Sequence, residues 1–309
     1  MKTRKFRNSV IAFTLAIFTV LFSTAVTCSS VKSPVPETMN LWDNLQLPLD
    51  ELMTGGIFSP KNNPYGFRYY YEMGINQHLE GTPYIMVFFL DDDMSFWTED
   101  SVKKFYNKLV TPSLSFLEES ASGYGVDLAF KIGYDATYVH PDKPLKYNGI
   151  VEPNSNTKAS LDIVDQAACA MGFSSKVEMH RYLQEYSGEE EIIYLFMLNK
   201  PGQTHAAVYG NSTECINYNG LLFEYCVIYT GFQDGVENVG NDAVAHEILH
   251  LYGAEDYYIP EERSAVASFL CPDDIMLCAQ SDVSDYRVCE LTAYSVGWFE
   301  IVPEAFNLF

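Results

Sequence analysis

The sequence predicts an α+β domain, α/β-like in its order, in which helices back a mixed, twisted sheet. Two continuous apolar runs, residues 83–90 and 191–198, are typical of buried central strands. Segments of helical periodicity alternate with such strands, and the last helix, near residue 246, carries histidine and acidic residues. The order β-α-β-α-β-β-β-α is typical of one sheet packed against helices in a single domain.

The first half of the domain contains one long predicted helix. Residues 98 to about 122 repeat apolar side chains at helical spacing, and Thr98 suits the start of a helix. Pro112 is expected to kink or break it, because proline lacks the N–H that a helix interior needs. Residues 126–132 alternate in polarity and predict a strand. Residues 135–158 contain three prolines and predict a loop.

The second half alternates in the same way. Residues 159–186 predict a helical stretch that is interrupted near Gly172. After the apolar run come two shorter strands, an edge strand at 205–209 and another at 224–229. Residues 231–240 form a loop that leads into the last helix.

The N-terminus is predicted to be an export signal. In residues 1–27, four basic residues precede an uncharged apolar run, and small residues follow it. A retained membrane helix is the alternative, because the uncharged run 9–27 approaches spanning length. Residues 28–60 are predicted to be a tether or linker, and a propeptide role stays open. Residues 61–309 then form one domain.

Cysteine usage agrees with export to the cell surface or secretion. Cys28 lies where the signal would end, in a sequence that loosely resembles a bacterial lipoprotein cleavage box, so a lipid anchor and simple secretion are both open. The even number of remaining cysteines permits three disulfides whose pairing the sequence does not fix. These are Cys169, Cys215, Cys226, Cys271, Cys278 and Cys289.

The net charge of −22 excludes nucleic acid as an expected partner, since phosphates require a basic face. Contact with a membrane is expected only through a lipid at Cys28. The oligomeric state is not predicted.

The feature that points to chemistry is the motif that begins at His246. His246 and His250 are four residues apart, so on a helix they share one face and can aim at one point. Glu247 lies beside that point, which is the arrangement of a zinc site with an adjacent general base. Asn241 or Asp242 is expected to cap this helix. The alternative is a helix that merely exposes polar residues.

Residues just after the helix complete the predicted site. Gly253 allows the chain to leave the helix in a left-handed turn and double back. That reversal brings Asp256 to the metal as a third ligand, which leaves one position open, as in catalytic zinc sites. Glu255, Tyr257 or Tyr258 could compete with Asp256 for the metal.

The pattern His-Glu-x-x-His-x-x-Gly-x-x-Asp resembles that of the metzincin metallopeptidases, most of which have histidine in the last position. Some members, the small bacterial snapalysins among them, use aspartate there. The resemblance covers about residues 80–300 and implies a metzincin-like fold with an active-site helix, a methionine turn and a C-terminal helix. It implies an upper subdomain to about residue 253 and a lower subdomain over 254–309.

The same resemblance implies a methionine beneath the metal. Met276 is the candidate, although methionine also serves as ordinary core packing. A bridge between Cys271 and Cys278 would pin that turn, and residues 290–298 would form the C-terminal helix.

The implied activity is that of an exported zinc-dependent endopeptidase. One catalytic Zn²⁺ held by His246, His250 and Asp256 would bind a water that Glu247 deprotonates for attack on a peptide bond. The substrate is then a protein or peptide, and by family analogy it pairs with the edge strand at 205–209. Candidates for binding the oxyanion are Tyr252, Tyr257, Tyr258 and Tyr294.

Three other interpretations of the sequence are open. One is a cell-surface binding protein that retains the fold with little proteolysis, and an intact Glu247 disfavours it. Another is a gluzincin-type peptidase, whose last ligand is a glutamate on a later helix. Calcium at the acidic run 91–93 is a weaker hypothesis. The remaining histidines lack metal-binding spacing: His78, His140, His180 and His205.

Overall fold

A computed structural model describes most of the predicted domain. The described residues are 74–133, 145–147, 150–151, 163–208, 217–218, 221–233, 236–237, 239–258, 261–277 and 282–299. The predicted signal peptide, the tether and Cys28 lie outside these ranges, so those interpretations stay predictions. No helix within the described ranges combines the length and apolar character needed to cross a membrane.

The centre of the fold is a mostly parallel sheet. Its strands run in the order β2-β1-β4-β8-β5, and β3 pairs with the end of β1. All pairs are parallel except β5 with β8, which places an antiparallel strand at the edge. The strands are β1 (Tyr84–Asp91), β2 (Lys131–Ile132), β3 (Leu145–Lys146), β4 (Ile192–Leu198), β5 (His205–Ala207) and β8 (Tyr225–Tyr229).

Two short hairpins lie outside this sheet. The first is β6 (Asn217–Tyr218) with β7 (Leu221–Leu222), and the second is β9 (Phe232–Gln233) with β10 (Val236–Glu237).

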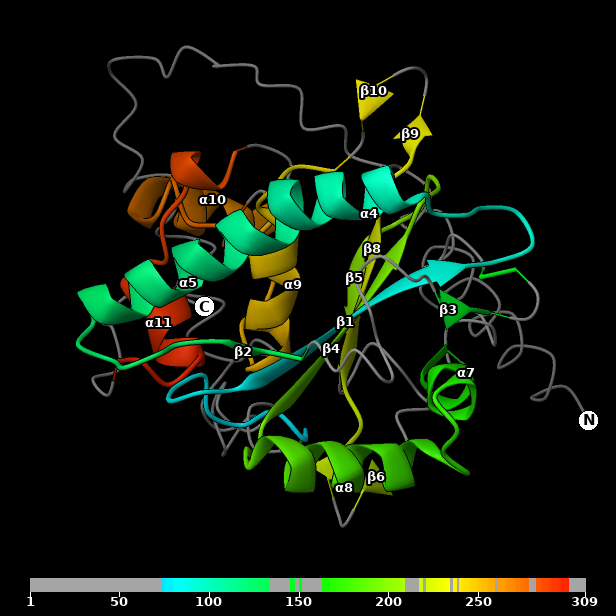
Figure 1. Ribbon diagram of the computed structural model, residues 1–309. Coiled ribbons are helices and arrows are strands. Elements are labelled where there is room, and N and C mark those ends of the chain that lie inside the picture. The colour runs from blue at the N-terminus through cyan, green and yellow to red at the C-terminus, as the bar shows by residue number, and fades with distance from the viewer. Residues whose placement is uncertain are drawn as a thin grey trace, which may run out of the picture. The chain divides into compact units, whose positions relative to one another are not determined.

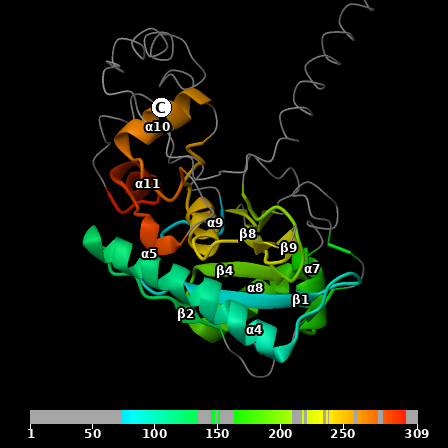
Figure 2. The same cartoon turned by 90° about the horizontal axis from the view of Figure 1, so that it is seen from above.

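Helices cover both faces of the sheet (Figure 1). One face carries α9 and α5, and the other carries α7 and α8. The helices are α4 (Glu99–Phe105), η1 (Tyr106–Val110), α5 (Thr111–Gly123), α7 (Ile163–Ala170), α8 (Lys176–Ser187), α9 (Ala243–Leu251), α10 (Glu261–Leu270), η2 (Val283–Asp285) and α11 (Glu290–Ser295). In Figures 1 and 2, α9 stands between the sheet and the segment that contains α10 and α11.

The layers explain why the central strands are apolar throughout. Successive side chains of β1 point to opposite faces, so Val87 lies in the core that contains α9, and Phe88 lies in the core that contains α7 and α8. Strand β4 is buried at every position. The predicted mixed sheet with backing helices is confirmed at this level.

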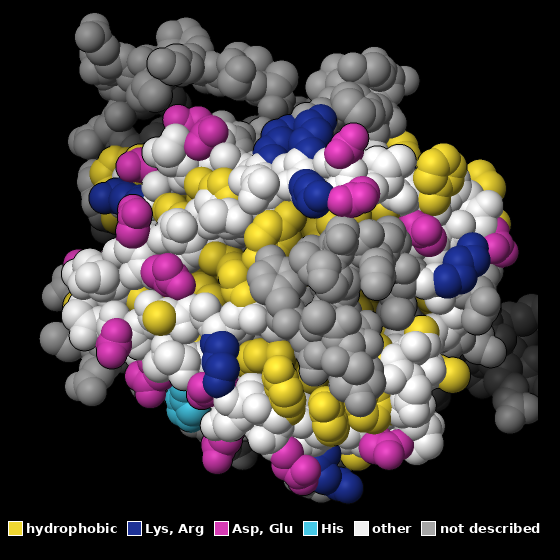
Figure 3. All heavy atoms as spheres, viewed as in Figure 1, with side chains coloured by type: hydrophobic (Ala, Val, Ile, Leu, Met, Phe, Trp, Pro, Cys, Tyr) yellow, Lys and Arg dark blue, Asp and Glu magenta, His cyan; other side chains and the backbone are white. Residues whose placement is uncertain are grey.

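Acidic residues outnumber basic ones, 41 to 19, and both kinds are visible on the surface (Figure 3). Figure 3 shows the acidic side chains scattered between the fewer basic side chains over the described part of one face.

The helix is expected to kink or break at Pro112, but it does not break there and continues past this residue. A π-helical turn, η1, immediately precedes α5, and Pro112 lies in the first turn of α5. The backbone N–H of Thr111 bonds to the carbonyl of Tyr106, five residues back. This wider turn accommodates the proline ring, which in a regular helix would collide with the carbonyl four residues earlier.

Other boundaries differ from the predictions by a few residues. The strand predicted at 126–132 is reduced to β2, although Leu128 makes an isolated bridge with Gly81. The helical stretch at 159–186 is interrupted near Gly172 as predicted, where φ is 92°. The edge strand is confirmed at His205–Ala207.

The predicted side-chain cap of α9 is wrong. Asp242 occupies the cap position but has helical backbone angles, and its side chain makes no capping bond. The Asn241 side chain accepts the backbone N–H of Val283 at 2.6 Å instead. Asn241 therefore ties the start of α9 to the segment before α11.

No pair of described cysteines is joined. Cys226, Cys271 and Cys289 are buried thiols, and Cys169 is an exposed one. The pairings that involve Cys215 or Cys278, including the one with Cys271, fall outside the described residues.

Candidate metal centre

Helix α9 holds the motif in place because its own surface is almost entirely buried. Val244, Ile248 and Leu249 are fully buried in the core that it shares with the sheet. The helix ends as predicted, since Gly253 adopts a left-handed φ of 94° and the chain turns back. The reversal places Asp256 opposite the histidine face.

Three ligand atoms converge there. The Oδ1 atom of Asp256 lies 3.1 Å from Nε2 of His246 and 3.2 Å from Nε2 of His250. The two Nε2 atoms are 3.2 Å apart. In a tetrahedral zinc site with bonds of about 2.0–2.1 Å, ligand atoms are separated by about 3.3–3.4 Å. These side chains therefore fit such an ion. Among the described residues, they are the group of potential metal ligands whose ligand atoms lie close together.

Backbone carbonyls fix both imidazole rings. Nδ1 of His246 donates to the carbonyl of Ile275 at 2.9 Å, and Nδ1 of His250 donates to that of Ala254 at 2.7 Å. Because a carbonyl only accepts, each Nδ1 carries a proton, so in the neutral form of either ring Nε2 is the nitrogen whose lone pair can reach a metal at the common point. The motif gave no indication of Ile275, which lies 29 residues beyond His246.

Hydrogen bonds join the turn that contains Ile275 to the segment after Asp256 and to helix α11. Met276 is fully buried, and its carbonyl accepts the backbone N–H of Tyr257 at 2.8 Å. The carboxylate of Asp274 accepts the N–H of Met276 at 2.8 Å and the hydroxyl of Thr292 at 2.8 Å. Met276 thus lies on a tight turn next to the ligand histidines.

Glu247 lies between α9 and the edge strand. Its side chain is buried, and its carboxylate accepts the backbone N–H of Ala206 on β5. Burial raises the pKa of Glu247, and the neighbouring histidines only partly offset this effect. A buried carboxylate of raised pKa next to a metal site is suited to proton transfer.

The tyrosines that are candidates for binding the oxyanion differ in their positions relative to the ligand histidines. The Tyr258 ring stacks on His246, with centroids 6.5 Å apart, and it is 45% exposed. The Tyr257 hydroxyl instead bonds to the hydroxyl of Thr292 in the core, and Tyr252 is fully buried. Of these three tyrosines, Tyr258 is the one that is exposed and whose ring contacts a ligand histidine.

Comparison with protein-family models, curated proteins and solved structures gave no significant match. Inference about function therefore rests on the geometry of this centre.

The other sequence candidates lie elsewhere. His180 bonds to the hydroxyl of Tyr194 at 2.9 Å in the opposite core, and Nδ1 of His205 bonds to the carbonyl of Gln203. His140 lies outside the described residues. Neither His180 nor His205 belongs to the ligand cluster.

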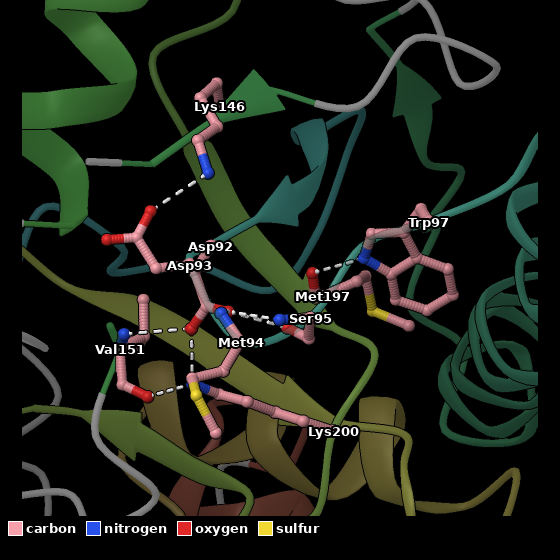
Figure 4. Close-up of polar contacts among 9 residues, drawn as sticks. All are labelled: Asp92, Asp93, Met94, Ser95, Trp97, Lys146, Val151, Met197 and Lys200. Carbon is pink, nitrogen blue, oxygen red and sulfur yellow. Dashed lines mark hydrogen bonds and ion pairs between the residues drawn. The ribbon is translucent and has the colours of Figure 1, made fainter. Parts of the chain in front are cut away.

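The acidic run at 91–93 does not form a common site, and Figure 4 shows two of its members, Asp92 and Asp93, with separate partners. Asp92 faces Lys200, and Asp93 pairs with Lys146 at 3.3 Å on the surface. Asp91 accepts a backbone N–H six residues further along the chain. The three carboxylates thus have separate partners, and their geometry does not support the calcium hypothesis.

The ion pair of Lys200 with Asp92 is structural. The Asp92 side chain is fully buried, and Lys200 also donates to the carbonyl of Val151. Replacing Lys200 by methionine is expected to cost about 3–5 kcal/mol in urea unfolding, because it leaves a buried charge unpaired. The control is Lys146→Met, which breaks the exposed pair with Asp93 and should cost far less. Equal decreases in the free energy of unfolding in the two variants would contradict this account.

Electrostatics in the metal-free centre favour protonated histidine. Burial lowers the pKa of His250, but the adjacent Asp256 carboxylate outweighs it and raises the value to about 9. Burial also lowers the pKa of His246, but the hydrogen bond and the charge of Asp256 raise this pKa above its usual value. The two histidines together hold the pKa of Asp256 far below its usual range, although burial acts to raise it.

Zinc affinity should consequently rise with pH. Zinc binds neutral imidazole, so it must displace the proton that His250 carries below about pH 9. We expect the apparent affinity to increase at least about tenfold per pH unit between pH 7 and 9 and to level off above that range. This affinity is measured by titrating zinc in competition with a chelator whose own zinc affinity is known at each pH. An affinity that does not change between pH 7 and 9 would be inconsistent with a proton on His250.

Proposed function

We propose that the protein is an exported zinc-dependent endopeptidase of metzincin type. The observation that carries the proposal is the triangle of ligand atoms from His246, His250 and Asp256, with sides of 3.1–3.2 Å. Three protein ligands leave a tetrahedral ion one open position, which distinguishes catalytic zinc from a closed structural site. Met276 on its tight turn, the helix α11 and the mixed sheet agree with the metzincin arrangement.

The roles of the protein groups follow from their positions. Bound zinc would supply Lewis acidity, which acidifies a water and polarises a substrate carbonyl. Glu247 takes the proton of the attacking water and later delivers it to the leaving amine. The bond from the Ala206 N–H holds the Glu247 carboxylate in place. Tyr258, exposed beside His246, is positioned to donate to the oxygen on which negative charge develops.

A peptide substrate would bind at the edge of the sheet. Strand β5 is the terminal strand of the main sheet, and it lies directly beside the carboxylate of Glu247. An extended peptide that pairs with this edge would bring a carbonyl near the metal.

A peptide-library assay tests the proposal. The full-length protein is loaded with one equivalent of zinc and incubated with mixed peptides. Cleavage products should appear, disappear after chelation with 1,10-phenanthroline and return when zinc is restored. Stoichiometric zinc without any cleavage would contradict the peptidase proposal and favour a binding protein that retains the fold.

A further inference from the structure

Two buried cysteines lie together on either side of the turn whose Ile275 carbonyl bonds to His246. Cys271 directly follows α10, and Cys289 directly precedes α11. Each is only 7% exposed. Their thiols are close enough to share a hydrogen bond, and this contact, followed by burial, raises the pKa of Cys289.

Backbone geometry brings the two residues together independently of the thiols. The N–H of Asp274 donates to the carbonyl of Cys271 at 3.0 Å, and the Asp274 carboxylate accepts the N–H of Cys289 at 2.7 Å. Asp274 and Arg287 form a parallel bridge, in which the N–H of Ile275 donates to the carbonyl of Arg287 at 3.0 Å. The segments that carry the two cysteines are therefore held side by side.

We propose that Cys271 and Cys289 form a disulfide bond that fixes the turn that contains Ile275. The two thiols lose two protons and two electrons as the sulfur–sulfur bond forms. The electrons pass by thiol–disulfide exchange to another disulfide, either that of a disulfide-exchange protein or glutathione disulfide, which is reduced to two thiols. Exchange takes place during folding, before burial suppresses the thiolate. Cys278, seven residues after Cys271 in the sequence, is the competing partner.

The bond would act on the metal through Ile275. This residue lies between the two cysteines in the sequence, and its carbonyl orients the His246 ring. Closing the loop limits the movement of that carbonyl, so the ring stays directed at the metal. The pairing itself does not depend on the proposed function, whereas its effect on zinc requires only that the centre binds metal.

Peptide mapping of the oxidatively folded, full-length protein tests the pairing. Free thiols are blocked with N-ethylmaleimide, and the chain is digested without reduction by trypsin together with a protease that cleaves before aspartate. Cuts before Asp273 and Asp274 separate Cys271 from Cys278, and the cut after Arg287 releases Cys289. Mass spectrometry should find the Cys271 and Cys289 peptides joined. A blocked Cys289, or one joined to any other cysteine, would overturn the proposal.

Zinc affinity tests the effect on the centre. The double variant Cys271→Ser, Cys289→Ser should bind zinc about 10–100-fold more weakly than the oxidised wild type, the range for loss of support to a ligand. The control Cys169→Ser removes an exposed thiol and should have no effect. Reducing the wild-type protein under native conditions provides the same comparison if the double variant does not fold. Equal affinity in the oxidised and reduced wild type would refute the link to the metal.

Discussion

Replacing Glu247 by glutamine is expected to leave zinc bound and to lower kcat/KM for peptide cleavage by about 10²–10⁴-fold. Glutamine retains the size of the side chain and can still accept the N–H of Ala206. It cannot take a proton from water, so the loss reports on proton transfer alone. None of the three ligand atoms belongs to Glu247, and the metal content should therefore be unchanged.

The measurement combines metal analysis with steady-state kinetics on a cleaved peptide. Glu119→Gln on the exposed face of α5 is the matched control, since it removes the same charge away from the centre. Residual activity within a few-fold of the wild type in Glu247→Gln would show that another group is the base.

Replacing Asp256 by alanine is expected to weaken zinc binding by at least about 100-fold. Loss of a group that merely orients a ligand costs about 10–100-fold, and loss of a direct ligand should cost no less. The change also removes the carboxylate that raises the pKa of both histidines, so proton competition decreases and partly offsets the loss. The affinity should accordingly fall most at high pH.

Glu255→Ala is the control for this variant, because it removes a negative charge one residue away. It also tests the competing ligand considered from the sequence, since Glu255 does not belong to the cluster. Calorimetric titration with zinc at pH 7 and pH 9 compares the two. If Glu255→Ala loses more affinity than Asp256→Ala, the ligand assignment is wrong.

Features that depend on local spacing were predictable from the sequence. The four-residue interval between His246 and His250 and the glycine after the helix carry the ligand geometry themselves. The strands β1 and β4 were equally clear, because burial on both faces demands an uninterrupted apolar run.

Features that depend on backbone contacts between distant segments were not predictable. The carbonyl of Ile275 leaves no trace in the side-chain pattern, yet it sets the proton position on His246. Asn241 suits a helix cap by residue type, but tertiary contact with Val283 takes its acceptor. The proximity of Cys271 and Cys289 likewise follows from the bridge between Asp274 and Arg287, not from spacing.

X-ray absorption at the zinc K-edge tests the central claim most directly. The spectrum of the zinc-loaded protein should show four nitrogen or oxygen neighbours at about 2.0–2.1 Å, with imidazole scattering from two histidines. One neighbour should be exchangeable, and the imidazole signal should fall in His246→Ala. A sulfur shell at about 2.3 Å, or a spectrum unchanged in His246→Ala, would contradict a zinc ion held by His246, His250 and Asp256.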